Sequence, residues 1–459
     1  MEDIIRYILR FFAGERLSGD TSRIVCQTAD SSHIDRFIGY TSDTALFSGY
    51  KVVIIPSGFF DEGMYGTNRS NPTLPLEKIE GTPFLFGSPK VERVGDTIVV
   101  HADLVASAYF MISRYEEILH RDRRDEHGRF PGCESLPYRA GFIDRPVVDE
   151  YGSLIRKWLK ESGVDVNEYA PFIRKVNLTH DVDAPFLCRT WRNVARVVLS
   201  GRSSITTAVR DKYKPVEQDM NYTFPWMLEQ NRTLQDAIGS DRCESLLFFR
   251  AGGTDEHDKP RYGLHGKDIR ALFDLCRKNG ATVGLHSSYQ AGIDPSLILS
   301  EKKHLEDAFG AGVTQNRHHF LASREPEDME YLEKAGITND YTLGYADVAG
   351  FRLGTASPVR YINPITRRMS SSLTLHPLTF MDGTLHESKY MHLTSEEAWA
   401  YCQKLIDNVR NANGELTILW HNTSAIEGNS YLKELYTKIV KLVESGKLKI
   451  ENGEWRVEN

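Results

Sequence analysis

The feature that most constrains the fold is an alternation of short apolar runs and amphipathic helical segments that begins near residue 175. The segment 266–278 is typical, with Ile269, Leu272 and Phe273 at helical spacing. Repeated strand–helix units joined by right-handed crossovers form a parallel sheet. We count about seven such units, which favours closure of the sheet into a barrel over an open sheet.

The chain divides between residues 161 and 175. Glu161-Ser162-Gly163 ends a helical stretch, and Pro171 precedes the next apolar run. We therefore expect two domains, a smaller α/β domain at residues 1–165 and a (β/α) barrel at residues 170–459.

The first domain is expected to contain helices and strands in mixed order. The predicted elements are helices at 4–12 and 104–119 and strands at 51–55 and 97–101. The densely charged run 121–129 is expected to be a solvated loop, with contact to a ligand as the alternative.

Composition narrows the function classes. The 56 Lys and Arg residues against 63 Asp and Glu residues give a net charge of −7, and no basic block stands out. A nucleic-acid binder is therefore unexpected, because such a protein needs a basic surface. No apolar run is long enough to span a bilayer, and the N-terminus does not resemble a secretory signal. Six dispersed cysteines without a CxxC motif suggest free thiols, so we expect a cytoplasmic protein.

Polar residues follow the predicted strands. In His180-Asp181-Val182-Asp183, the two aspartates are two positions apart, so in an extended chain both face the barrel mouth while His180 and Val182 face the helices. Two carboxylates this close need a cation nearby to remain ionised. One aspartate as a metal ligand and the other as a general base would meet this need. The alternative is an ordinary solvated turn.

Other strand ends carry imidazole and guanidinium groups. His286 follows one strand, Arg317 and His319 another, and His421 a third. One carboxylate and two imidazoles form an open set of three metal ligands that leaves room for water and substrate. A second carboxylate could then accept the proton of water, and a separate histidine could protonate the leaving group. Arg317 could keep the basic carboxylate oriented and ionised. This set fits metal-assisted hydrolysis of an amide or ester.

These motifs resemble those of the NodB-homology polysaccharide deacetylase family, and their order is the same. The likeness covers residues 175–425, and the segment 344–355 resembles one found in bacterial members. The N-terminal part is similar to an accessory domain that precedes the barrel in some bacterial homologues. The motifs are Thr179 to Asp183, His286 to Tyr289, Arg317 with His319, and Trp420 to Asn422.

The resemblance implies a distorted (β/α)7 barrel that removes N- or O-linked acetyl groups from sugars with the help of a divalent metal. It implies that Asp181 is the base, oriented by Arg317, and that His421 is the general acid. Asp183 and His286 would be metal ligands.

The second motif departs from the family pattern. It usually ends in a second metal-binding histidine, but Tyr289 and Gln290 stand there in this chain. Either His319 supplies the imidazole from the next strand, or the metal is held more weakly, or no metal binds. We favour His319, because its two-residue spacing from Arg317 places both on the interior face.

Three residues are candidates for substrate binding. Tyr289 could line the cleft and hold the oxyanion. Arg352 could bind a carboxylate or phosphate, or could be a packing arginine paired with Asp347. Trp420 could stack on a sugar ring or belong to the core.

Three further residues have lesser candidate roles. Asp340 and Asp382 could orient the ligands or could be simple turn residues, and His376 is a reserve ligand.

The sequence thus predicts a metal-dependent deacetylase acting on an acetylated carbohydrate. Zinc is the expected ion, and nickel, cobalt and iron also suit a site of histidine and carboxylate. Two alternatives stay open. One is a carbohydrate-binding protein on a barrel that has lost its activity, and the other is an amidohydrolase for a small amide that is not a sugar.

Overall fold

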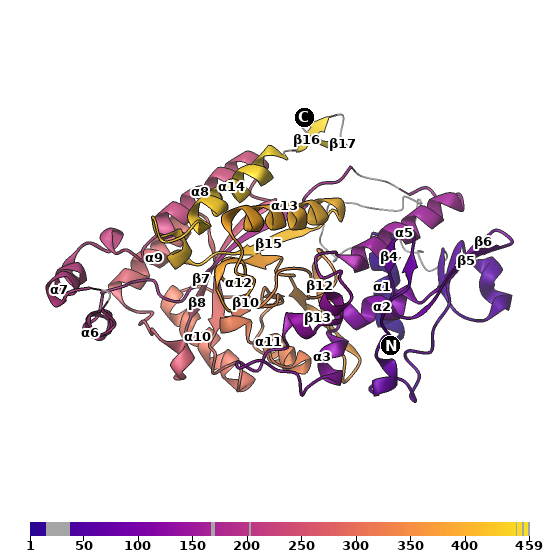
Figure 1. The fold of residues 1–459 in the computed structure, drawn as a ribbon, viewed down its shortest axis with the longest axis horizontal. Helices are drawn as coiled ribbons and strands as arrows, with labels where there is room; N and C mark the ends of the chain where they lie inside the picture. Colours follow the sequence, from indigo (N-terminus) through magenta and orange to yellow (C-terminus); the bar gives the residue numbers. More distant parts are fainter. Residues whose placement is uncertain (15–36, 167–169, 202, 447, 452–453, 458–459) are drawn as a thin grey trace.

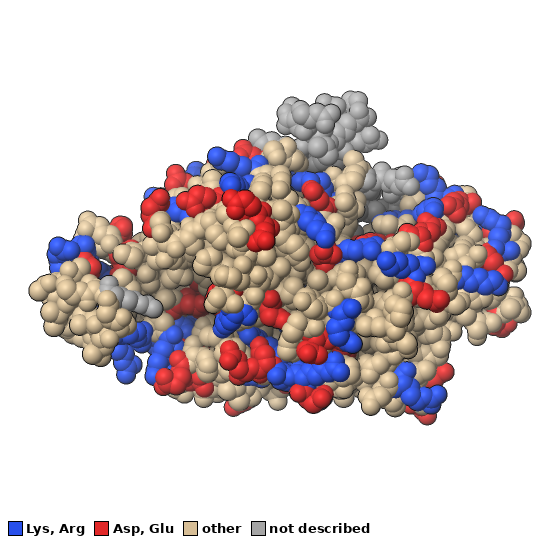
Figure 2. Space-filling model, in the orientation of Figure 1, with Lys and Arg blue, Asp and Glu red and all other residues tan. Residues whose placement is uncertain are grey.

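The computed structural model describes residues 1–14, 37–166, 170–201, 203–446, 448–451 and 454–457. Figure 1 shows the first part of the chain at one end of an elongated molecule, beside a larger part that contains the main sheet. Basic and acidic side chains are intermixed over the face drawn in Figure 2. Among the described helices, none has the length and apolar character needed to cross a membrane. The five described cysteines are free thiols, and Cys26 lies outside the described residues.

The first part of the chain folds around a four-stranded sheet with the order β1-β2-β6-β5. Strands β1, β2 and β6 are parallel, and β5 is antiparallel to β6. A short antiparallel hairpin, β3–β4, lies between β2 and β5 in the chain order. The strands are β1 (Ile38–Tyr40), β2 (Val52–Ile54), β3 (Lys78–Ile79), β4 (Thr82–Pro83), β5 (Gly87–Val94) and β6 (Thr97–Ala102).

Helices pack on this sheet through apolar faces. In α1, Ile4, Ile8 and Phe12 recur at helical spacing and are buried. The helix ends at Gly14, whose φ of 99° is a left-handed conformation that glycine adopts without a steric penalty. The helices of this part are α1 (Glu2–Ala13), α2 (Leu104–Ile112), α3 (Tyr115–Leu119), α4 (Leu136–Arg139) and α5 (Val147–Glu161).

The predicted helix at 104–119 is two helices, because Arg114 breaks it. Arg114 has a φ of 59°, in the left-handed region that a continuing right-handed helix excludes. Its guanidinium group is buried, 2.5 Å from Glu117 Oε2, and it donates to Ser323 in the second part of the chain. Long-range contacts of one side chain thus override the local helical pattern.

The second part contains a nine-stranded sheet with the order β12-β13-β11-β10-β9-β8-β7-β15-β14. All neighbouring pairs are parallel except β12 and β13. The strands are β7 (Lys175–Val182), β8 (Cys243–Arg250), β9 (Thr282–Ser287), β10 (Gln315–His318), β11 (Asn339–Asp340), β12 (Val359–Asn363), β13 (Arg368–Leu375), β14 (Phe380–Met381) and β15 (Glu415–Leu419). A further hairpin joins β16 (Leu448–Glu451) to β17 (Glu454–Val457).

The sheet is strongly curled. His376 follows β13, and its Nδ1 lies 3.0 Å from Glu415 Oε2 on β15, six positions away in the strand order. In a flat sheet, strands six positions apart would be separated by roughly 29 Å. The described strands nevertheless do not close into a hydrogen-bonded ring. The antiparallel β12 occupies the outer edge of β13, and β14 forms the other edge of the sheet. The predicted parallel sheet is therefore present, as a curled mixed sheet with eight parallel strands rather than seven.

Helices cover the convex face of this sheet (Figure 1). Helices α8, α13 and α14 bury Leu234, Leu405 and Ile439 against Leu178 of β7 and Ile418 of β15. The helices of this part are α6 (Trp191–Leu199), α7 (Ile205–Tyr213), α8 (Phe224–Ile238), α9 (Lys267–Lys278), α10 (Ile298–Phe309), α11 (Glu330–Lys334), α12 (Asp382–His386), α13 (Ser395–Asn411) and α14 (Leu432–Ser445).

The two parts of the chain share one apolar core. Phe12 and Tyr151 from the first part belong to the same buried cluster as Leu353 and Leu373 from the second. The buried carboxylate of Asp149 accepts hydrogen bonds from Thr355 Oγ1 at 2.7 Å, Ala356 N at 2.8 Å and Ser357 Oγ at 2.8 Å. Burial of this polar network is compatible with stability because each of these contacts satisfies the carboxylate.

Candidate active site

Strand β7 presents Asp181 on the concave side of the sheet. Alternate residues Val176, Leu178 and Val182 pack into the apolar clusters behind the strand. Asp181 has the opposite parity, so it faces the interior, as the strand period requires. His180 faces the helices and accepts a hydrogen bond from Asn231 Nδ2 of α8 at 2.9 Å.

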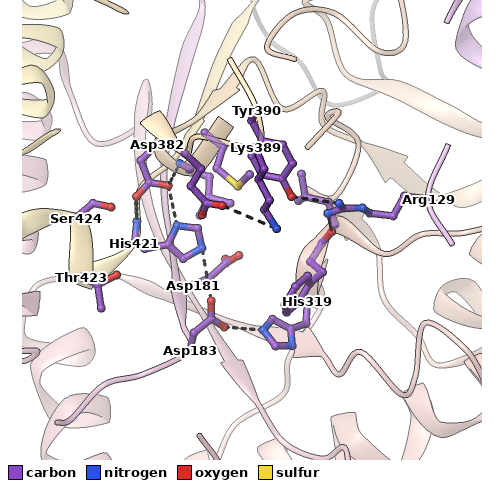
Figure 3. Close-up of a pocket in the computed structure, with 16 residues that line it drawn as sticks. Arg129, Asp181, Asp183, His319, Asp382, Lys389, Tyr390, His421, Thr423 and Ser424 are labelled. Carbon is purple, nitrogen blue, oxygen red and sulfur yellow. Dashed lines mark hydrogen bonds and ion pairs between the residues drawn. The ribbon is translucent and has the colours of Figure 1, made fainter. Parts of the chain in front are cut away.

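Asp183, His286 and His319 come together at the carboxyl ends of β7, β9 and β10. One possible ligand atom from each lies within 4.8 Å of the other two. Asp183 Oδ1 is 3.2 Å from His286 Nε2 and 3.4 Å from His319 Nε2. Figure 3 shows Asp183 and His319 facing each other across one side of the cavity. This is a possible metal site of one carboxylate and two imidazoles.

The second nitrogen of each imidazole has a partner that fixes its proton. His286 Nδ1 lies 2.9 Å from the carbonyl oxygen of Arg317, and His319 Nδ1 lies 3.0 Å from Asp258 Oδ1. Both partners can only accept hydrogen bonds, so each Nδ1 carries a proton, and in the neutral ring each Nε2 presents a lone pair toward Asp183. Metal-binding histidines are commonly oriented in this way.

The donor atoms fit a cation. Asp183 Oδ1 and His286 Nε2 are buried and have no hydrogen-bond partner. Buried polar atoms without partners are costly, so such a pair pointing at a common position needs an explanation. Two neutral imidazoles and a carboxylate are the ligand types that zinc and other late first-row metals prefer. The residues therefore fit a divalent ion.

Burial and neighbouring charges shift the pKa values of His319 and Asp183. Burial lowers the pKa of His319, although Asp183 and Asp258 act in the opposite sense. Burial would raise the pKa of Asp183, but His319, His286 and His421 outweigh it and hold this pKa well below its usual range. A neutral imidazole beside an ionised carboxylate is the form that binds a cation.

Arg317 and Asp181 form a buried ion pair. Arg317 Nη1 donates to Asp181 Oδ1 at 3.1 Å and to Thr179 Oγ1 at 2.7 Å, and Nε donates to the Tyr341 carbonyl at 3.0 Å. These contacts fix the guanidinium group in one orientation. The other Asp181 oxygen, Oδ2, lies 3.5 Å from His286 Nε2, so Asp181 borders the triad.

His421 lies next to Asp183 of the triad. Its Nε2 lies 3.5 Å from Asp183 Oδ2, and its Nδ1 lies 2.7 Å from Asp382 Oδ1. Asp382 Oδ2 also accepts from the His421 backbone N–H at 2.7 Å. Burial lowers the pKa of His421, but Asp382 and the nearby Asp183 and Asp181 reverse the effect and raise it to about 10. His421 is therefore protonated and oriented, as a proton donor must be.

A cavity of about 290 Å³ opens beside these groups. Figure 3 shows Asp181, Asp183, His319 and His421 along one side of it, and Arg129, Lys389 and Tyr390 along another. The full lining consists of Arg129, Asp181, Asp183, His319, Phe320, Leu321, Met381, Asp382, Gly383, Glu387, Lys389, Tyr390, Leu419, His421, Thr423 and Ser424.

The charged run 121–129 is not simply a solvated loop. Arg129 and His127 are each 6% exposed, and Arg129 lines the cavity. Sequence reasoning missed this because charge density alone does not distinguish a solvated face from one that packs on another part of the chain. It also missed Lys389 and Tyr390, which lie outside any recognisable motif.

His319 occupies a strained turn rather than the strand itself. Strand β10 ends at His318, and a 3-10 turn, η8 (His319–Leu321), follows. Phe320 and Leu321 have φ values of 61° and 53°, which are rare for residues with side chains. Each such residue costs on the order of 1–3 kcal/mol, so the surroundings must hold the turn in place. The expected interior position of His319 therefore depends on this turn as well as on strand parity.

Asp258 is the main residue that sequence reasoning missed. It ends the turn η6 (Glu256–Asp258), is fully buried, and accepts from the backbone N–H of Tyr289 at 2.8 Å as well as contacting His319. The only available signal was a charged loop after strand β8, which many surface loops share.

The three predicted substrate-binding residues do not line the cavity. Tyr289 is 5% exposed and stacks on His257 with ring centroids 4.3 Å apart. Arg352 is buried in an ion pair with Glu117, 2.9 Å from Oε2, rather than with Asp347. Trp420 is fully buried in the apolar cluster beneath α14 and packs against Tyr436.

The two remaining candidates also lie away from the triad. His376 pairs with Glu415 and stacks on Tyr341, with ring centroids 4.4 Å apart. Asp340 accepts hydrogen bonds from Asn316 Nδ2 and Thr342 Oγ1, both at 2.8 Å. None of these partners is Asp183, His286 or His319.

Comparison with known proteins gives one family model over the first part of the chain and a structural match over a larger share of it. A family of unknown function, DUF7033, matches residues 2–163. No curated protein matches. Among solved structures, the chain is similar to one described as a "putative polysaccharide deacetylase from Mycobacterium smegmatis", with 13% identity and a TM-score of 0.39 over 61% of this chain and 88% of that chain.

Proposed function

We propose that this protein is a metal-dependent hydrolase that removes N- or O-linked acetyl groups from a carbohydrate, on a curled sheet of the NodB barrel type. The observation that carries the proposal is the convergence of Asp183, His286 and His319, with two buried donor atoms that lack hydrogen-bond partners. The order of the surrounding motifs, which resembles that of the NodB-homology deacetylases, supports the choice of acetylated sugars.

The reaction adds water to the acetyl carbonyl carbon and breaks the C–N or C–O bond to the sugar, giving acetate and a free amine or hydroxyl. A divalent ion at the triad, with zinc as the proposed metal, would polarise the carbonyl and acidify water. Asp181 would accept a proton from the attacking water, and the Arg317 contact keeps its carboxylate oriented.

His421 would supply the proton that the leaving group needs. Its Nε2 faces the cavity, while Asp382 binds Nδ1 and the backbone N–H of the same residue. A protonated imidazole held from behind by a carboxylate can donate from the opposite nitrogen without reorienting. Asp181 would thus accept a proton and His421 would donate one in the same reaction.

The proposal is tested with the purified full-length chain. We expect about one zinc per chain by elemental analysis, and acetate release from N-acetylglucosamine oligomers or O-acetylated sugars that stops with a chelator and returns with zinc. Absence of metal after zinc, nickel, cobalt and iron supplementation would contradict the proposal and favour a carbohydrate-binding protein. Acetate release from simple acetamides without release from sugars would favour an amidohydrolase for small substrates.

A further inference from the structure

The segment that directly follows the proposed ligand His319 is held by arginines from the first part of the chain. We call residues 320–327 the post-ligand segment. It begins with the two left-handed residues Phe320 and Leu321, a conformation that needs support from outside the segment. Any relaxation of this backbone would displace the His319 ring from Asp183.

Two of these contacts hold the strained start of the segment. Arg129 Nη1 donates to the carbonyl of Phe320 at 2.7 Å. Arg114 donates to both Ser323 Oγ and the Ser323 carbonyl, each at 3.0 Å. Arg114, Arg129 and Ser323 are nearly inaccessible to solvent, which strengthens hydrogen bonds from a charged group.

Two further arginines hold the end of the segment. Arg124 Nη2 donates to both carboxylate oxygens of Glu325 at 2.9 Å. Arg121 also pairs with Glu325, and it pairs with Glu327 at 2.7 Å. Four arginines between residues 114 and 129 thus contact one eight-residue stretch of backbone and side chains.

The arginines at the strained end are themselves fixed. Arg129 pairs with Asp125 at 2.7 Å, and Arg114 pairs with Glu117 at 2.5 Å. Glu117 in turn pairs with Arg352 in the second part of the chain. Because these ion pairs also hold the guanidinium groups, the two arginines can act as rigid supports for the post-ligand segment.

We propose that the first part of the chain, which matches a family of unknown function, completes the metal site by positioning His319 through Arg114 and Arg129. This inference rests on the proposed function, since it takes His319 to be a metal ligand. In the motif that resembles the NodB-homology pattern, where a second histidine is usual, this chain has Tyr289 and Gln290. Contacts from the first part of the chain hold the turn after β10 in place, so that His319 can supply the second imidazole.

The test compares metal affinity in full-length variants. Arg129→Met removes the donor to Phe320 but not the ligand, so we expect the zinc dissociation constant, measured by competition with a chromophoric chelator, to rise about 10–100-fold, as for other groups that orient ligands. In the cobalt-substituted proteins, the ligand-field absorption spectrum reports the metal ligands. We expect the spectrum of Arg129→Met to differ from that of wild type and to resemble that of His319→Ala. Addition of guanidinium at millimolar concentration to Arg129→Met should restore part of the affinity.

A second variant avoids the buried region. Glu325→Gln weakens the other end of the support at a residue that is partly exposed, and we expect a smaller increase of the dissociation constant, about threefold to tenfold. The matched control is Asp144→Ala, which removes an ion pair between the two parts, with Lys404 of α13, away from the post-ligand segment. We expect wild-type zinc affinity in this control.

The outcomes separate the two proposals. If wild type binds zinc and Arg129→Met and Glu325→Gln bind it equally well, the positioning role is wrong while the proposed function stands. If Asp144→Ala weakens zinc binding as much as Arg129→Met, the effect is general packing between the two parts and the inference is also wrong. If wild type and His319→Ala both fail to bind metal, the proposed function itself fails.

Discussion

His319 Nδ1 lies 3.0 Å from Asp258 Oδ1, although the two residues are 61 positions apart in the sequence. The carboxylate cannot donate, so the contact fixes the tautomer of the ring and leaves Nε2 facing Asp183. Asp258 is in turn held by the backbone N–H groups of Tyr289 at 2.8 Å and Gln290 at 3.2 Å. The backbone of Tyr289 and Gln290 thus holds the carboxylate that orients the His319 ring.

The first prediction concerns this contact. Asp258→Ala removes the acceptor that orients His319, and we expect the zinc dissociation constant to increase about 10–100-fold. Chelator competition measures the change. The control is Asp255→Ala in the same loop, whose carboxylate pairs with His257 and does not touch the triad. Equal zinc affinity in wild type and Asp258→Ala would show that the contact does not orient a ligand.

The second prediction distinguishes the role of Asp181 in β7 from that of Asp183, which directly follows this strand. Asp181→Asn keeps the shape of the side chain but cannot accept the proton of water, so we expect kcat to fall about 10²–10⁴-fold with zinc content unchanged. Asp183→Asn should lose both zinc and turnover, because it removes the carboxylate of the triad. Undiminished kcat in Asp181→Asn, or loss of zinc from that variant alone, would contradict these roles.

The third prediction concerns the Asp382–His421 pair. Asp382→Ala removes the partner of His421 Nδ1, so the ring is no longer held toward the cavity. We expect kcat to fall about 10²–10⁴-fold, with little change in KM or in the zinc dissociation constant. Steady-state kinetics and metal titration on the same preparation measure these values. A variant with wild-type kcat would rule out His421 as a proton donor that depends on Asp382.

The fourth prediction concerns Arg352, whose ion pair with Glu117 is almost fully buried. Arg352→Met leaves Glu117 with one guanidinium partner instead of two, and we expect a loss of about 3 kcal/mol of unfolding free energy. We expect KM for an acetylated sugar to stay within about twofold of wild type, because Arg352 does not line the cavity. Unchanged stability with a strongly increased KM would restore the substrate-binding role that the sequence suggested.

The fifth prediction is a dependence of stability on pH through His180. Burial lowers the pKa of His180 from 6.5 to about 4, although its hydrogen bonds to Trp420 and Asn231 act in the opposite sense. Above pH 6.5 the ring is neutral in both the folded and unfolded states, so it has no effect on the pH dependence. Between pH 6.5 and 4 the unfolded state takes up a proton that the folded state does not, so stability falls.

The full loss from His180 is roughly 3 kcal/mol and is complete below pH 4. Thermal unfolding of wild type and His180→Gln between pH 7 and 4 measures this term, because the glutamine does not titrate. We expect the melting temperature of wild type to fall more steeply over this range. Parallel curves for the two proteins would show that His180 titrates normally in the folded state.

Local patterns predicted the order of the elements well. The helical segment expected at 266–278 contains α9, and the strands expected at His286 and before His421 are β9 and β15. Those elements have clear apolar periodicity and bounded ends, which depend on nearby residues only. The break at Arg114 was not predicted, because it depends on a contact with Ser323 far away in the sequence. The antiparallel edge strand β12 was also missed, although its partner β13 follows it directly in the chain.

The sequence also placed Asp183, His286 and His319 at strand ends, where the structure brings them within 4.8 Å of one another. It could do so because the carboxyl ends of parallel strands meet at one edge of a sheet. It did not distinguish Tyr289, Arg352 and Trp420 from groups at the cavity, because aromatic and basic residues pack in cores as readily as they bind ligands.

The sequence by itself determined which side chains lie at the ends of the strands, since strand period and chain order are local properties. Only the tertiary structure decided which of these side chains meet, which are buried elsewhere, and how His319 is oriented. The reason is that Asp258, Arg114 and Arg129 act on the His319 turn from loops and helices whose position depends on the packing of the whole chain.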